Sequence, residues 1–422
     1  MQKLPFVSFE KLKEIASVYP TPFHLYDEQG IRNTARDLYR AFSWNNGFRE
    51  YFAVKACPNP FILKLLKEEG CGVDCASIAE LKMAEAMGFR GDDIMFSSNE
   101  TPAEEYEYAR RLGAIINLDD ITHIDFLAKH GGIPEKICLR YNPGGELLIG
   151  SVYMGQPSGS KFGMTKQQIF SAAQRLMQLG VKQFGLHALL ASNAADNNYY
   201  PANAMILFEL AIELHQKLGM EFFLVNLSGG VGIPYQPGQE MPDIEKIGRA
   251  IEESFAVMTS AGLGGVPLST ELGRFMTGPH GCLVATAIHK KHIYKEYIGL
   301  DACAVDLMRP AIYDAYHHIT VAGKEDDLCD HVYDVVGSLC ENNDKFAVDR
   351  ALPQINDGDL IVIHDTGAHG YSMGYNYNGK LKSAEILLHP DGSFDMIRRP
   401  ETVRDYFATF DFCDILKDAK LD

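Results

Sequence analysis

Over its first two-thirds, the chain alternates short hydrophobic runs with longer segments whose hydrophobic residues recur at helical spacing. The short runs are rich in β-branched and aromatic residues, and we interpret eight of them as strands: 49–56, 72–77, 93–98, 114–119, 136–142, 183–190, 222–228 and 267–272. Several of the helix-like segments between them end on glycine, as helices often do. Eight successive β–α units predict a parallel (β/α)8 barrel. An open, doubly wound sheet would show the same alternation, but the count of eight favours the barrel.

The pattern changes after about residue 280, where strand-like runs separated by turns replace the helical spacing. Turn-forming sequences such as PDG and NDGD lie between these runs. We therefore predict a (β/α)8 barrel over residues 26–280 and a C-terminal β domain over 281–422, with an N-terminal segment, 1–25, that packs on the β domain. The longest loop-like stretch is 143–164.

Composition and charge narrow the function to small-molecule chemistry. The 422 residues exceed one ordinary domain but suit a barrel plus a second unit. The net charge of −17 disfavours nucleic-acid binding, because such a chain repels phosphates. No hydrophobic run reaches the roughly 18 residues of a transmembrane helix, and the N-terminus lacks a secretory pattern. Nine scattered cysteines without a C-x-x-C pair favour a reduced, cytoplasmic location, and we expect no metal site and no membrane association.

The active site of a (β/α)8 barrel lies at the C-terminal ends of its strands, where three features stand out. Lys55 ends the first strand; it is either a surface cation or, as a desolvated amine, a Schiff-base former. The seventh strand runs into SGGVGIP (228–234), whose backbone N–H groups can hold an anion, and the eighth ends in ELGR (271–274). A lysine, a phosphate loop and a carboxylate that keeps the ring nitrogen protonated are what pyridoxal phosphate requires.

These and later motifs resemble the fold type III pyridoxal-phosphate decarboxylases, and most closely the diaminopimelate decarboxylases. The motifs are YFAVKA, the glycine loop, ELGR, MRPAIYDAYHHI (308–319), VVGSLCENND (335–344) and DTGAHGYSMGYNYNG (365–379). Each motif alone is weak, whereas the ordered set spans nearly the whole chain. The resemblance implies a barrel with a C-terminal β domain, and a homodimer with shared active sites. It also implies decarboxylation of an amino-acid substrate, meso-diaminopimelate, to L-lysine.

The resemblance further implies roles for individual residues. Lys55 corresponds to the Schiff-base lysine and Cys340 to the residue that returns a proton to the α-carbon. The implied cofactor contacts also include His187, Ser192, Gly230, Gly232, Glu271, Gly273, Arg274, His369 and Tyr371. The implied substrate contacts are Arg274, Arg309, Tyr313, Glu341 and Tyr371. Ornithine-type enzymes usually carry aspartate where this chain has Glu341, so the glutamate favours diaminopimelate.

The chain departs from the family pattern at two positions. Leu189 occupies the place of a histidine that stacks on the cofactor ring in many members. His369 occupies the place of a tyrosine, and either His369 or Tyr371 could contact the phosphate or the substrate. Alternatives therefore stay open: a decarboxylase of ornithine, lysine, arginine or a carboxylated polyamine such as carboxynorspermidine, an amino-acid racemase, or a non-catalytic cofactor-binding regulator.

Overall fold

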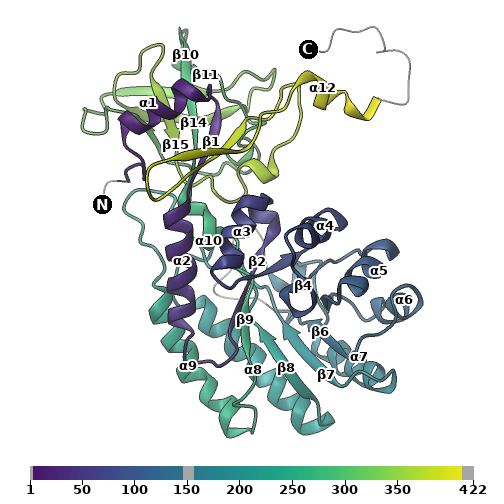
Figure 1. Cartoon of the computed structure of the whole chain (residues 1–422). Helices are drawn as coiled ribbons and strands as arrows, with labels where there is room; N and C mark the ends of the chain where they lie inside the picture. Colours follow the sequence, from purple (N-terminus) through teal and green to yellow (C-terminus); the bar gives the residue numbers. More distant parts are fainter. Residues whose placement is uncertain (1–2, 146–155, 411–422) are drawn as a thin grey trace. The chain divides into compact units, whose positions relative to one another are not determined.

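The computed structural model describes residues 3–145 and 156–410 (Figure 1). The chain divides into two compact units, which we describe one at a time. One contains Ile31–Ile233 and Glu240–Met276; the other contains the described parts of Met1–Gly30, Pro234–Gln239 and Thr277–Asp422. Among the described residues, no helix combines the length and the hydrophobicity needed to cross a membrane.

The first unit is a closed barrel of eight parallel strands, which confirms the predicted fold class. Each strand overlaps one of the eight predicted runs: β2 (Arg49–Ala53), β3 (Gly72–Cys75), β4 (Ile94–Phe96), β5 (Ile115–Leu118), β6 (Lys136–Arg140), β7 (Gln183–His187), β8 (Glu221–Asn226) and β9 (Leu268–Thr270). The ring closes where β2 pairs with β9, with Arg49 opposite Ser269 and Glu50 opposite Thr270. The strands are buried along most of their length, which explains why they read as hydrophobic runs without alternation.

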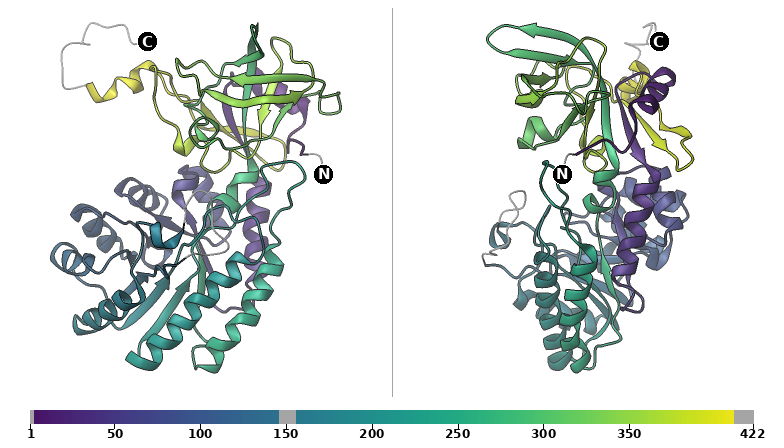
Figure 2. Two further views of the ribbon diagram at one scale, coloured as in Figure 1. Left: turned by 180° about the vertical axis from the view of Figure 1, so that it is seen from behind. Right: turned by 90° about the vertical axis from the view of Figure 1, so that its left-hand side faces the viewer.

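Helices lie outside the barrel strands (Figures 1 and 2). They are α2 (Glu28–Ala41), α3 (Pro60–Glu68), α4 (Ile78–Ala86), α5 (Ala103–Leu112), α6 (His123–His130), α7 (Lys166–Gln178), α8 (Tyr199–Leu218), α9 (Ile244–Ser260) and the short α10 (Arg274–Thr277). Local sequence sets several boundaries. Thr165 and Gln168 form a capping box that begins α7, and Gly219 ends α8 in a left-handed conformation with φ 66°.

The second unit is built around a nine-stranded sheet, as the predicted β domain requires. Its strands are β1 (Phe23–Asp27), β10 (Gly281–His292), β11 (Glu296–Leu300), β12 (Ile319–Val321), β13 (His331–Val336), β14 (Lys345–Leu352), β15 (Leu360–Ile363), β16 (Ala384–Leu388) and β17 (Phe394–Arg398). Strand β1 lies inside the sheet, antiparallel to β10 and parallel to β16. The N-terminal strand is thus paired on both sides with C-terminal strands. Short helices α1 (Phe9–Val18), α11 (Arg309–Tyr313) and α12 (Val403–Tyr406) complete the unit.

Gly248 marks a tight contact in the barrel unit, because a Cβ atom there would overlap the carbonyl oxygen of Ala41 at the end of α2. We expect Gly248→Ala to lower the melting temperature by about 4 °C or more, since overpacking outweighs the better helix propensity of alanine. Thermal denaturation followed by circular dichroism measures this. Glu252→Ala, on an exposed position of α9, is the control and should shift the midpoint by about 1 °C or less. Equal shifts for the two variants would contradict the packing argument.

Candidate functional site

Lys55 lies two residues beyond the end of β2, in a short 3-10 turn, Val54–Ala56. The sequence predicted strand through residue 56, but pairing ends at Ala53 and the chain turns there. Val54 and Ala56 are buried and fix this turn, while the lysine side chain keeps 54% of its surface exposed. Its Nζ atom lies 3.9 Å from Oδ2 of Asp74, near the end of β3. The turn therefore presents an accessible amine beside a carboxyl group.

Glu271 is the first residue after β9, and side chains from the ends of β4, β7 and β8 surround its buried carboxylate. Asn226 donates to Oε1 at 2.6 Å, while Ser228 Oγ and His187 Nε2 each lie 3.0 Å from Oε2. Burial raises the pKa of Glu271, but the interactions with His187, Lys55 and Asn226 outweigh it and lower the pKa to about 2. Glu271 is therefore an anion at neutral pH, as a partner for a protonated ring nitrogen must be.

The pKa of Asp74, in the same barrel, is shifted in the opposite direction to that of Glu271. Burial and the nearby charge of Glu271 raise the pKa of Asp74 well above its ordinary value, although Lys55 opposes the shift. Two carboxyl groups near one lysine thus have pKa values moved in opposite directions, which is a common feature of catalytic sites.

Sequence reasoning missed Asp74, and it also missed Arg140, the last residue of β6. Arg140 is buried, and its Nη1 atom lies 3.2 Å from Oδ1 of Asp119. Both could have been found as charged residues near the end of a hydrophobic strand, because barrel strands end at the active site. In fact every barrel strand has a polar side chain at or near its C-terminal end: Lys55, Asp74, Ser97, Asp119, Arg140, His187, Asn226 and Glu271.

The predicted phosphate loop packs against the loop that follows β7. Ala194 N–H donates to Gly230 O at 2.8 Å, and Gly232 N–H donates to Ala194 O at 2.7 Å. Gly230 has φ +116°, which L-residues rarely adopt, and a Cβ at Gly232 would lie 2.8 Å from the carbonyl carbon of Asn193. Glycine is therefore required for this close approach. The packing brings the chain segment that contains Ser192 alongside Gly230 and Gly232.

The turn after β9 contacts the turn that carries Lys55. A Cβ at Gly273 would lie 2.7 Å from Cβ of Ala56, so only glycine allows the two turns to meet. Arg274 follows at the start of α10 and is 8% exposed. The ELGR motif thus places an acidic and a basic side chain next to the lysine turn.

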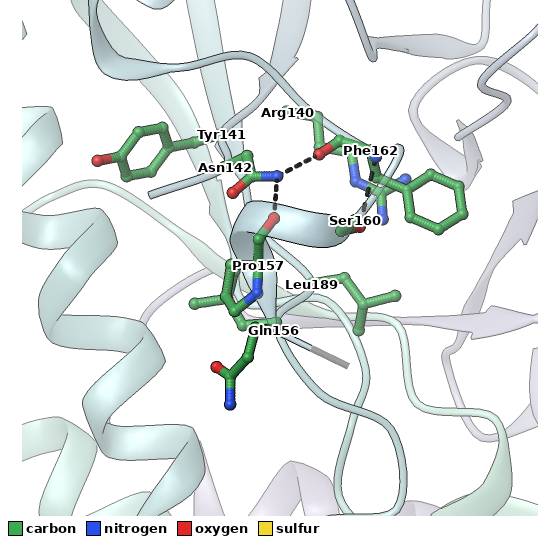
Figure 3. A pocket seen from close by; sticks show the side chains of 9 residues that line it. Arg140, Tyr141, Asn142, Gln156, Pro157, Ser160, Phe162 and Leu189 are labelled. Atoms are coloured by element: carbon green, nitrogen blue, oxygen red, sulfur yellow. Dashed lines mark hydrogen bonds between the residues drawn. The ribbon is translucent and has the colours of Figure 1, made fainter. Parts of the chain in front are cut away.

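Leu189 lines a small pocket with Arg140 and Phe162 (Figure 3). The guanidinium carbon of Arg140 lies 4.4 Å from the centroid of the Phe162 ring. The Asn142 amide donates to the carbonyl oxygens of Pro157 at 3.0 Å and of Phe162 at 2.8 Å, and so ties this part of the loop to β6. The cavity has a volume of about 10 Å³, enough for one water molecule. Part of the predicted loop 143–164, residues 146–155, lies outside the described residues.

The remaining predicted site residues belong to the second unit. Arg309 begins α11, is 2% exposed, and donates from Nε to Nε2 of His317 at 3.3 Å. Its guanidinium carbon lies 5.2 Å from the centroid of the Tyr235 ring. Tyr313, at the end of α11, is 47% exposed.

Cys340 is an exposed free thiol, and its backbone N–H donates to Oδ1 of Asn378 at 2.6 Å. Glu341 next to it is also exposed. Both residues therefore lie on a loop whose side chains are accessible to a ligand or a partner chain.

His369 and Tyr371, which the sequence could not distinguish, have different surroundings. His369 adopts a left-handed backbone conformation with φ +57°, a conformation that non-glycine residues seldom adopt outside constrained sites. The Tyr371 ring packs edge-on to His24, with centroids 5.8 Å apart. The amine of Lys382 lies 4.6 Å from the Tyr371 ring centroid, and the guanidinium carbon of Arg398 lies 4.7 Å from it.

The barrel residues fit pyridoxal phosphate. Among the described residues, the buried polar atoms of the barrel that have no hydrogen-bond partner include three near the C-terminal ends of strands: Asp74 Oδ1, Asn117 Oδ1 and His187 Nδ1. Buried polar atoms are usually satisfied, so these three indicate a polar ligand. Lys55 offers an amine for covalent attachment, the glycine loop offers backbone N–H groups for a phosphate, and Glu271 offers an anion for a ring nitrogen.

Comparison with known proteins agrees with this geometry. Residues 29–278 match the family described as pyridoxal-dependent decarboxylase, pyridoxal binding domain. Protein TabA of Pseudomonas amygdali pv. tabaci is 40% identical over 94% of this chain and 93% of its own. The diaminopimelate decarboxylase of Methanothermobacter thermautotrophicus is 34% identical over 93% of this chain and 92% of its own.

Solved structures give the same result. The diaminopimelate decarboxylase from M. jannaschii, in complex with L-lysine, superposes with a TM-score of 0.86 and 28% identity, over 94% of this chain and 93% of that one. The Helicobacter pylori enzyme, also complexed with L-lysine, has a TM-score of 0.86 and 26% identity, over 95% and 99% of the two chains. The chain therefore belongs to the pyridoxal-dependent decarboxylases, within the diaminopimelate decarboxylase family, and is a pyridoxal-phosphate-dependent enzyme.

Proposed function

We propose that this enzyme decarboxylates meso-diaminopimelate to L-lysine. The observation that carries the proposal is the convergence of Lys55, the glycine loop and ionised Glu271 at one end of a barrel whose whole chain resembles diaminopimelate decarboxylases. The L-lysine in two of the similar structures is the product that this reaction would release.

Bound pyridoxal phosphate supplies a carbonyl that condenses with amines and a ring that withdraws electrons from the α-carbon. In this proposal the Lys55 amine would hold the cofactor covalently, while the backbone N–H group of Gly230, together with Ser192, would bind the phosphate. Gly232 would shape the phosphate site by allowing the two loops to approach closely, because its own N–H group already donates to Ala194 O. Glu271 would keep the ring nitrogen protonated. A protonated ring withdraws electrons from the α-carbon more strongly than a neutral one, so this contact would lower the barrier to carbon–carbon cleavage.

The second unit would supply the substrate contacts. Arg309, with its planar fork of N–H groups, would bind the distal carboxylate together with Tyr313, and Glu341 would bind the distal amino group. Cys340 would deliver a proton from its thiol to the α-carbon. The exposure of Cys340 and Glu341 supports a homodimer in which each chain completes the other's site.

We propose that His369, rather than Tyr371, contacts the cofactor or the substrate. The Tyr371 ring is already packed against Lys382, Arg398 and His24 of its own unit. The constrained backbone of His369 supports a functional role, because such conformations cluster at ligand sites. Arg274, buried beside the lysine turn, would bind the cofactor phosphate or the substrate carboxylate.

A second candidate is the decarboxylation of a related amino acid. The identity to protein TabA, 40%, exceeds the 34% identity to the Methanothermobacter diaminopimelate decarboxylase. Leu189 and His369 also depart from the family pattern.

Carbon dioxide release from a panel of amino acids separates these candidates. We expect kcat/KM for meso-diaminopimelate to exceed that for L-lysine by at least about 100-fold, because L-lysine has no distal carboxylate to bind buried Arg309. The panel includes ornithine, arginine and carboxynorspermidine. Robust turnover of one of these, with none of diaminopimelate, would reject the first candidate. Exchange of the α-proton without gas release would indicate a racemase, and a bound cofactor without any turnover would indicate a regulator.

Borohydride reduction tests the role of Lys55. The protein loaded with pyridoxal phosphate should gain the mass of the reduced cofactor at Lys55, as peptide mass spectrometry measures, because reduction makes the lysine linkage permanent. Lys55→Ala should gain no mass. Lys64→Ala, an exposed lysine on α3, is the matched control and should be labelled like the wild type. Labelling of Lys55→Ala at another lysine would contradict the assignment.

Gly230→Ala tests the phosphate loop. A Cβ at this position would lie 2.7 Å from Cε1 of Tyr199 and 2.9 Å from the carbonyl oxygen of Ala191, on a backbone with φ +116°. We expect the dissociation constant for pyridoxal phosphate to rise by about tenfold or more, measured by fluorescence titration. Gly238→Ala is the control, since it also has positive φ but nothing within 4 Å, and its affinity should stay unchanged. Equal affinities for both variants would place the phosphate elsewhere.

A further inference from the structure

We propose that His187 is a positioning residue that acts through Glu271. It is a neutral imidazole that donates its Nε2–H to the carboxylate and so holds Glu271 as an oriented anion. This inference rests on the proposed pairing of Glu271 with the cofactor's ring nitrogen, and it concerns neither the choice of substrate nor a direct contact between His187 and the cofactor.

The geometry is that of a buried side-chain pair at two strand ends. His187 is the last residue of β7 and is 1% exposed, while Glu271 follows β9 and is 6% exposed. The Nε2 atom lies 3.0 Å from Oε2 of Glu271, within the range of a good hydrogen bond. Asn226 and Ser228 hold the same carboxylate from β8 and the residues that follow it, so His187 is the contact that comes from β7.

The protonation state follows from the two ring nitrogens. If Nδ1 alone carried the proton, the Nε2 lone pair would face a carboxylate oxygen at 3.0 Å, which is repulsive. If both nitrogens were protonated, the Nδ1–H donor would be buried without an acceptor among the described residues. The remaining form, neutral with Nε2–H, leaves only an acceptor unsatisfied, which costs less than a buried donor without a partner. Burial also lowers the pKa of His187, although Glu271 opposes the shift.

The charged groups around the pair favour the same form. Arg140 and Lys55 both disfavour a positive charge on His187, while Glu271 favours one. A neutral donor leaves the full negative charge of Glu271 available to a protonated ring nitrogen. An imidazolium in the same place would cancel much of that charge and weaken the interaction.

A double-mutant cycle separates action through Glu271 from a general effect on β7. The variants are His187→Leu, His187→Gln, Glu271→Gln and the two combinations with Glu271→Gln. His187→Gln retains an N–H donor that can reach Glu271, and Leu186→Val changes a neighbouring buried residue of β7 that is directed away from the pair. Each holoenzyme is assayed for kcat and KM with whichever amino acid it decarboxylates best, and for the affinity of pyridoxal phosphate.

We expect His187→Leu to lower kcat by about 10- to 100-fold with a change in KM of less than about threefold, and His187→Gln to recover most of that loss. In the Glu271→Gln background, His187→Leu should change kcat by less than about twofold, because the residue through which it acts is gone. Equal losses in both backgrounds, or a His187→Gln variant as impaired as His187→Leu, would overturn the proposal. Leu186→Val should retain the wild-type kcat.

Nitrogen NMR of histidine-labelled apoprotein tests the protonation state without activity. The His187 resonances, assigned by their loss in His187→Gln, should report a neutral Nε2–H form from about pH 7 to 8. An imidazolium or an Nδ1–H form in that range would overturn the proposal. If the protein does not bind pyridoxal phosphate, the proposed function fails, and the NMR result still decides the protonation state of the pair.

Discussion

The barrel site depends on one physical constraint, which is that a carboxylate must stay charged inside a protein core. Removing Glu271 from water costs several kcal/mol unless hydrogen bonds replace the lost hydration. Asn226 and Ser228, at the end of the adjacent strand β8, and His187, at the end of β7, provide those bonds. Parallel barrel strands all end at the same rim, so residues far apart in the chain can converge on one carboxylate. The charge of Glu271 therefore depends on the barrel, which brings these side chains to the same rim.

Glycine supplies the second requirement, which is close approach of the loops. Gly230 and Gly232 allow the loop after β8 to pair with the loop after β7, and Gly273 allows the turn after β9 to reach the turn that carries Lys55. A side chain at any of these positions would push the strand ends apart. The flexibility of glycine in isolation matters less here than the space that its missing side chain leaves.

The two units of the chain carry different sets of functional side chains. The barrel carries the groups suited to the cofactor, and their pKa shifts arise from burial and from one another. The second unit carries the proposed substrate groups, among them Arg309, buried against His317 and Tyr235. Its accessible Cys340 suits a residue that must meet substrate. Because pyridoxal-dependent chemistry is common to many amino acids, the choice of substrate depends on groups outside the cofactor site.

Hydrophobic periodicity and turn chemistry alone predicted all eight barrel strands and the change to a β domain, because barrel strands are buried on both faces. The sequence also predicted that Lys55, the glycine loop and Glu271 follow strand ends, since such positions are local features. It missed Asp74 and Arg140, and it could not pair His187 with Glu271, 84 residues away. Which polar side chains meet, and which carboxyl keeps its proton, depends on distances and burial between strands. Only the tertiary structure decides those quantities.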